Sequence, residues 1–140
     1  MAYVDADLPR FDVPTCRVRT LVVKTHEPDS VQKATSLLED ALRILSIPGR
    51  EERRIYFVRR FALPSFTLAQ SSSALALTIQ EQLRHLLASA VHATHDRAAR
   101  ASCIFFSHPL EPFTILAVNI ARDKETRAWF WPLAVPRWRS

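Results

Sequence analysis

Glycine is nearly missing from this sequence, in which Gly49 is the only one in 140 residues. Average usage of about 7% would give roughly ten. Loops that cradle phosphate need backbone N–H groups close to the ligand and residues at positive φ, which only glycine adopts freely. The glycine motifs of dinucleotide sites, P-loops and nucleophile elbows are all missing, as are Asn-Gly and Asp-Gly hairpins. These absences disfavour nucleotide chemistry and an all-β meander.

Cysteine and long apolar runs are also scarce. Neither Cys16 nor Cys103 has a second cysteine at metal-binding spacing, so both are expected to be reduced thiols in the core. No stretch approaches the ~20 apolar residues that span a bilayer. The acidic N-terminus MAYVDADLPRFDVP lacks the apolar region of a secretory signal. The sequence therefore predicts a cytoplasmic protein with no membrane segment.

The composition is that of a globular protein. Hydrophobic residues make up 48% of the chain and charged residues 24%. The chain is long enough to bury one hydrophobic core and too short for two ordinary domains. Prolines occur in both the N-terminal and the C-terminal segments of the chain. We expect an extended arm over residues 1–14, a single α/β domain over 15–132, and a tail or linker over 133–140.

Three apolar segments have the pattern of β-strands: residues 16–25, 53–63 and 101–107. The middle segment has β-branched and aromatic residues on both of its faces, which is typical of a central strand. Residues 127–130 are expected either to add a fourth strand or to lie across a sheet edge.

Three amphipathic segments follow these strands. The first begins near residues 28–30 and ends near 48–49, the second extends from the serines at 71–73 to about His95, and the third starts after Pro109. In the third, Phe113, Leu116, Ala117 and Ile120 make the expected buried stripe. The order β-α-β-α-β-α favours an α/β fold, with three helices on a small three- to four-stranded sheet that is mostly parallel or mixed.

No set of side chains satisfies the requirements of catalysis or metal binding. His92 and His95 are three residues apart near the end of the second predicted helix, but a zinc site needs three or four ligands. Ser107 and His108 are adjacent, and adjacent strand residues point to opposite faces, so they cannot form a dyad. We expect no catalytic residue, no metal and no cofactor, and hence a protein that is not an enzyme.

A net charge of +5 raises the question of nucleic acid. Arg53, Arg54, Arg59 and Arg60 flank an apolar run and are the candidate phosphate contacts. Two glutamates precede them, and the chain has no uninterrupted basic tract. Nucleic-acid binding is therefore the alternative hypothesis.

Tryptophan and arginine cluster near the C-terminus, and these residue types are enriched at binding hot spots. If this segment is extended, neighbouring aromatic side chains point to opposite faces, and one face must meet a partner. The candidate partner-binding residues are Arg127, Trp129, Trp131, Arg137 and Trp138.

Two pieces of text, IYFVRRFALP (55–64) and AWFWPLAVPRW (128–138), resemble uncharacterised bacterial proteins associated with loci for phage-tail-like contractile injection systems. With LLEDALRILSIPG (37–49), the resemblance covers roughly residues 37–138. It implies an accessory or assembly role and offers no catalytic residues to transfer. The leading hypothesis is a non-catalytic interaction or assembly module that contacts a protein partner or a second copy.

Overall fold

The structure is a computed structural model, and it describes residues 17–47 and 53–139. Within these residues, helices and strands alternate along much of the chain and form a mixed α/β fold, as predicted from the sequence. The elements in chain order are α1 (Ser30–Ile44), β1 (Ile55–Val58), α2 (Ser72–Ala88), β2 (Val91–His92), the 3-10 helix η1 (Ala98–Arg100), β3 (Cys103–Phe106), α3 (Glu111–Ala121) and α4 (Trp131–Ala134).

The described strands form one three-stranded sheet in the order β1-β3-β2. β1 pairs antiparallel with β3, with Phe57 opposite Ile104, and β2 pairs parallel with β3, with Val91 opposite the same residue. The predicted small, mixed sheet is therefore confirmed. β3 lies at its centre, and its residues are the most fully buried of the three strands.

The strand predicted over residues 16–25 was wrong for the described part, 17–25, which forms no strand. A strand needs a neighbouring strand to pair with its backbone N–H and C=O groups. Residues 17–25 pair with no strand in the described part of the chain. Val18 and Val22 lie exposed, whereas Val23 packs against the helices α1 and α2. The chain consequently enters α1 from an irregular segment, and the predicted order loses its first strand.

The prediction that 53–63 supplies a central strand was also wrong. β1 is an edge strand of only four residues, each half-buried. Aromatic and β-branched residues on both faces do not require two neighbouring strands, since the two faces are covered differently. Phe57 faces the main core, whereas Tyr56 packs beside Phe105 on the other face.

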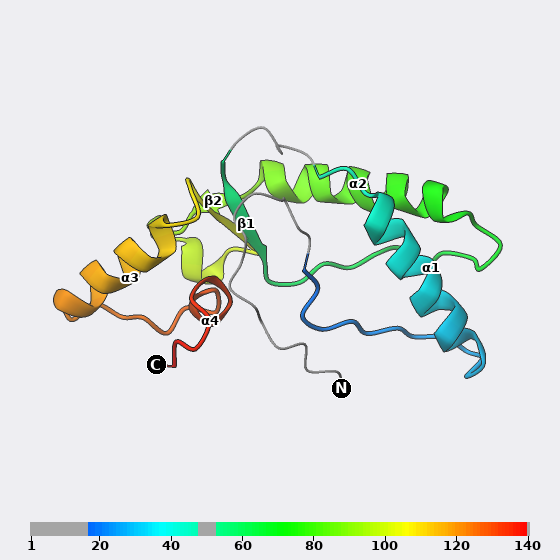
Figure 1. Ribbon diagram of the computed structural model, residues 1–140, viewed down its shortest axis with the longest axis horizontal. Helices are drawn as coiled ribbons and strands as arrows, with labels where there is room; N and C mark the ends of the chain where they lie inside the picture. Colours follow the sequence, from blue (N-terminus) through cyan, green and yellow to red (C-terminus); the bar gives the residue numbers. More distant parts are fainter. Residues whose placement is uncertain (1–16, 48–52, 140) are drawn as a thin grey trace.

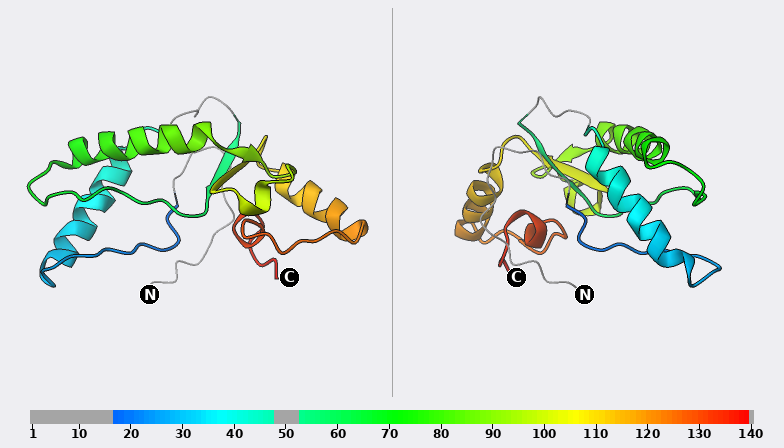
Figure 2. Two further views of the ribbon diagram at one scale, coloured as in Figure 1. Left: turned by 180° about the vertical axis from the view of Figure 1, so that it is seen from behind. Right: turned by 45° about the vertical axis from the view of Figure 1, so that its right-hand side comes forward.

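Two apolar clusters hold the fold together. The first fills the space between the sheet, α3 and α4, with Ile104, Phe106 and Leu116 at its centre. The second joins α1 to α2 through Ala41 and Leu75. Figure 1 shows the sheet between these two parts, with the α1 and α2 pair on one side and α3 and α4 on the other, and the reverse view in Figure 2 agrees.

Helix α2 begins where the serines predicted a start and ends earlier than predicted. The Ser71 side chain accepts a hydrogen bond of 3.1 Å from the backbone N–H of Ala74, which satisfies one of the first-turn donors. At the other end, the Ser89 hydroxyl donates to the Leu86 carbonyl at 2.8 Å. The chain then enters β2 instead of continuing in helix to His95.

The end of α3 shows how this chain manages with so little glycine. Asp123 has a φ of 51°, in the left-handed region where glycine normally stands after a helix. The N–H of Lys124 donates to the Asn119 carbonyl at 2.8 Å, and the N–H of Asp123 donates to the Ile120 carbonyl at 3.1 Å. This is the Schellman pattern of hydrogen bonds, completed by an aspartate.

The C-terminal segment at residues 127–130 does not form a strand. Residues 127–130 lead through a turn into α4, whose four residues lie beneath the sheet in Figure 1. The range expected to be a tail begins at 133, yet Ala134, Val135 and Trp138 pack on the main core. The N-terminal arm predicted over 1–14 lies outside the described residues.

No helix in the described ranges is long and apolar enough to cross a bilayer.

Candidate interaction surfaces

Trp131 is part of the core and not of a partner-binding surface. Its side chain is 2% exposed, and its ring lies 5.9 Å from that of Phe106 and 5.0 Å from that of Phe130. The expectation of an exposed aromatic face assumed an extended segment, in which alternate side chains diverge. Because the segment turns into α4, Trp131 and Phe130 both reach the same core cluster.

The other two tryptophans are half-buried. Trp129 stacks edge-on against Phe130 at 5.6 Å, and its indole N–H is shielded without a hydrogen-bond partner in the described part of the chain. Trp138 donates its indole N–H to the Thr126 carbonyl at 3.4 Å. Both rings therefore mainly close the domain, which reduces the surface that they offer to a partner.

Arg127 and Trp138 do come together, at an open hollow that also includes Arg139. Its lining carries charges of both signs, because Asp123 and Glu125 stand beside the arginines. A surface of mixed sign does not select strongly for an anionic ligand.

The fifth predicted contact, Arg137, is exposed at a φ of 75°. The tertiary structure thus brings only part of the predicted site into one place.

The four arginines of the alternative hypothesis gather at the two ends of β1. Arg53 and Arg54 precede the strand, Arg59 and Arg60 follow it, and all four side chains are exposed. The guanidinium of Arg54 lies over the ring of Phe105 at 4.3 Å, a cation–π contact across to β3. The structure therefore places two exposed arginines at each end of one edge strand of the sheet.

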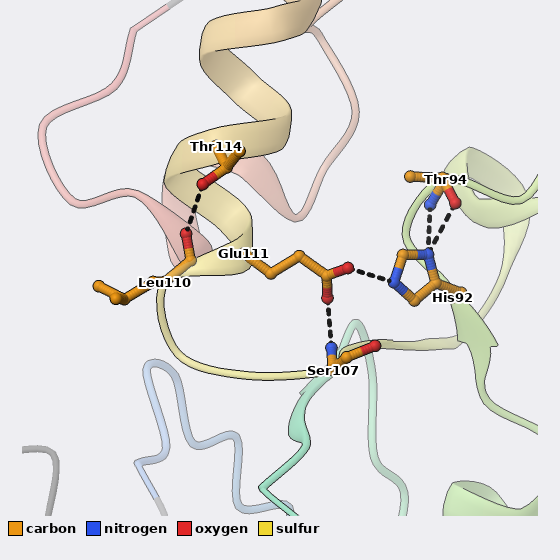
Figure 3. Close-up of polar contacts among 6 residues, drawn as sticks. All are labelled: His92, Thr94, Ser107, Leu110, Glu111 and Thr114. Carbon is orange, nitrogen blue, oxygen red and sulfur yellow. Dashed lines mark hydrogen bonds and ion pairs between the residues drawn. The ribbon is translucent and has the colours of Figure 1, made fainter.

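A polar cluster that the sequence analysis missed joins β2 to the start of α3 (Figure 3). The His92 Nε2 lies 3.0 Å from the Glu111 Oε1, and the other carboxylate oxygen accepts the Ser107 backbone N–H. The Thr94 backbone N–H donates to the His92 Nδ1 at 3.2 Å, and the Thr94 hydroxyl oxygen lies 2.7 Å from the same nitrogen. His92 and Glu111 are 19 residues apart in the sequence, so no short sequence motif predicts their contact.

Hydrogen bonds within the chain occupy both ring nitrogens of His92. Because the Thr94 N–H must donate, the His92 Nδ1 accepts, and the ring proton of the neutral form is assigned to Nε2, where it bonds Glu111. Both ring nitrogens are then engaged within the chain.

Glu111 ties the strand β3, the strand β2 and the helix α3 together through its carboxylate. Partial burial alone would raise its pKa, but the hydrogen bonds from the Ser107 N–H and from His92, together with the His92 charge, lower that pKa below its ordinary value. The folded state therefore favours the ionised carboxylate. This contribution to stability is complete above the ordinary pKa of about 4.5 and is lost as the pH falls through the lower folded value.

The variant Glu111→Gln is expected to lose about 1–3 kcal/mol of unfolding free energy near pH 7, because an amide cannot accept both hydrogen bonds. Chemical denaturation at neutral and at acidic pH measures this loss. The difference from the native chain should shrink at acidic pH, where the native carboxyl is also neutral. A loss of equal size at both values would mean that packing and not charge is responsible.

The structure also places other side chains that the sequence analysis considered for metal binding or as core thiols. His92 lies in β2 and His95 in the turn after it, so the two histidines do not share the end of a helix as the sequence predicted. Across residues 17–47 and 53–139 there is no group of three potential metal ligands. Cys103 is a free and buried thiol whose pKa burial raises to about 11, which matches the expected inert core cysteine. The second cysteine, Cys16, lies outside the described residues.

Helix α3 exposes an apolar face that the sequence analysis assigned to the core. Leu116 and Pro112 are buried as one side of the helix packs against the first cluster. Phe113 and Ile120, predicted to be buried, are 45% and 50% exposed. The helix is apolar on nearly all sides, so its periodicity alone could not select the buried side.

The exposed side of α3 carries no charge. Glu111 is the only charged residue of the helix, and it turns inward to His92. Helical geometry places the remaining exposed positions on one continuous face. They are Leu110, Phe113, Thr114, Ala117, Val118, Ile120 and Ala121, and we call them the α3 face.

Comparison of the chain with known protein families, with curated proteins and with solved structures finds no match.

Proposed function

We propose that this chain is a non-catalytic protein-interaction module and that the α3 face is its principal contact surface. The main support for this proposal is that α3, a helix at the periphery of the fold, has a continuous, uncharged and apolar exposed side (Figure 1). Scattered single apolar residues are ordinary on protein surfaces, whereas contiguous apolar patches mark interaction sites. Leu110, Phe113, Val118 and Ile120 are contiguous in this sense.

The size of the α3 face favours a place in a larger assembly. An 11-residue helix is about 16 Å long and about 10 Å wide. One side of it covers less than the roughly 800 Å² per partner that a stable pairwise interface buries. The α3 face therefore suits an apolar groove in one component of a complex that holds the chain by several surfaces. A bacterial assembly such as a contractile injection system is the setting that we propose from the sequence resemblance.

The test is a double charge substitution, Phe113→Glu with Ile120→Glu. Both side chains are exposed, so the fold should remain intact, and recovery of the partner from nuclease-treated native lysate should fall at least about tenfold. Leu77→Glu is the matched control, since Leu77 is an exposed leucine on a different helix. Circular dichroism checks the fold of each variant.

Three outcomes are distinguishable. Proteins retained by the native chain and the Leu77 control, but lost from the α3 variant, support the proposal. The same proteins retained by all three chains would overturn it. A native chain that sediments as a dimer, and a variant that sediments as a monomer, would identify the occupant of the α3 face as a second copy.

A further inference from the structure

The outer edge of β1 has backbone groups that no described strand receives. β1 is the end strand of the sheet, with β3 on its inner side. The N–H of Arg59 donates to the Ser102 carbonyl at 2.8 Å, which fixes the alternation of inward and outward groups along the antiparallel pair. Phe57 therefore directs its N–H and C=O toward β3. Tyr56 and Val58 direct theirs away from the sheet.

Arginines lie at both ends of this edge, and two glutamates precede the first pair in the sequence, whereas no acidic residue adjoins the second pair. Arg53 and Arg54 stand before the strand, and Arg59 and Arg60 stand after it, all exposed. Proteins commonly guard an open edge with charge, because an unguarded edge pairs with other chains. The charges of Arg53, Arg59 and Arg60 oppose pairing with the β1 of a second copy, since arginines would meet arginines. They favour a strand that brings acidic side chains.

The edge is also held in place before any ligand arrives. Tyr56 and Phe105 form a close pair across the two strands, with ring centroids 6.0 Å apart. Arg54 lies over the same Phe105 ring, and on the opposite face Phe57 packs edge-on against Phe106 at 5.9 Å. A preformed strand lowers the ordering cost of adding another one.

We propose that the open edge of β1 binds an extended acidic segment of a partner protein by strand addition. The backbone of that segment pairs with the outward groups of Tyr56 and Val58. Arg53 and Arg59 are six positions apart, about 20 Å along a strand. Acidic residues on each side of a stretch of about four β-forming residues meet Arg53 at one end and Arg59 and Arg60 at the other. Backbone pairing supplies affinity, and the flanking charges select the partner.

This inference deepens the proposed interaction role and uses a different surface. The α3 face is apolar and lies on a helix, whereas the β1 edge is a charged rim of the sheet. Substitutions on one surface leave the other unchanged. Loss of acidic-segment binding and loss of the α3 partner are therefore separate results, and either one can fail alone.

The binding test uses the full chain and a synthetic peptide of about eight residues, with a Thr-Val-Thr-Val stretch between two pairs of aspartates. Fluorescence anisotropy should show saturable binding that weakens as ionic strength rises. A second peptide replaces both threonines with proline, which keeps the charge but prevents strand pairing. Its affinity should be at least about tenfold lower.

Protein variants locate the site. Arg59→Glu with Arg60→Glu should weaken peptide binding at least about tenfold. Arg43→Glu with Arg84→Glu alters the net charge equally on two helices and should leave binding nearly unchanged. Val58→Pro removes only an outward N–H and should weaken binding, whereas Val58→Ala should not. The proline peptide tests the same pairing without altering the protein fold.

Several results would overturn the proposal. Equal binding of the proline peptide would show simple charge attraction without a new strand. Equal loss in the Arg43 and Arg84 variant would show a response to net charge alone. An oligonucleotide that binds more tightly than the peptide, and binds the Val58→Pro variant equally well, would assign the four arginines to nucleic acid.

Discussion

Replacement of Trp131 by alanine is expected to destabilise the fold by about 3–5 kcal/mol, the range for removal of a large buried aromatic side chain. Trp131 is almost fully buried and contacts the rings of Phe106 and Phe130. The indole packs in the first cluster with buried residues of β3 and α3, so its removal leaves a large cavity there. The result would show that this tryptophan holds the C-terminal helix onto the sheet.

Thermal and urea unfolding, followed by circular dichroism, measure the effect of Trp131→Ala. The midpoint should fall by roughly 10 °C or more. Trp138→Ala is the matched control, because its half-buried ring contacts the same cluster and donates only one hydrogen bond. It should cost about 1–2 kcal/mol. Equal losses in the two variants would contradict the assignment of Trp131 to the centre of the core.

Leu75→Ala is expected to cost about 2–5 kcal/mol, the second large effect. Leu75 is 1% exposed, and with Ile79 and Ala41 it forms the contact between α1 and α2. Truncation removes apolar contacts and leaves a cavity between the two helices, and the cost depends on how far the surrounding leucine and phenylalanine side chains relax into it. Removal of Leu75 should therefore loosen α1 from α2.

Leu77→Ala provides the control on the same helix. Leu77 is 67% exposed only two positions away, so its truncation should change stability by no more than about 0.5 kcal/mol. Helix propensity is nearly the same in both variants, since each exchanges leucine for alanine. Urea unfolding of the pair isolates the burial effect. Similar losses at Leu75 and Leu77 would overturn the packing of α1 on α2.

The sequence correctly indicated elements whose signals are local. Ser71 caps α2, the apolar text after residue 101 becomes β3, and the helix after Pro109 is α3. Each depends on hydrogen bonding or side-chain shape within a few residues. Cys103 was likewise expected to be a buried free thiol and is one. Signals of this kind require no knowledge of the distant chain.

Most of the incorrect expectations concerned which face of an element meets which neighbour. Residues 17–25 have the sequence pattern of a strand but pair with no strand in the described part of the chain. β1 has the sequence pattern of a central strand but lies at the edge of the sheet. The α3 helix is apolar nearly all round, so either side could have been buried. A periodic pattern predicts that a helix or strand has an apolar face, but it does not predict which other element will pack against that face.

The candidate surfaces divide in the same way. The sequence by itself determined the arginines at 53–54 and 59–60 and the tryptophans near the C-terminus, because residue type and clustering are properties of the text.

Only the tertiary structure decided that Trp131 is core, that α3 shows an apolar face, and that His92 meets Glu111. The physical reason is that burial and long-range pairing depend on how the elements pack, and packing joins residues that no local spacing connects.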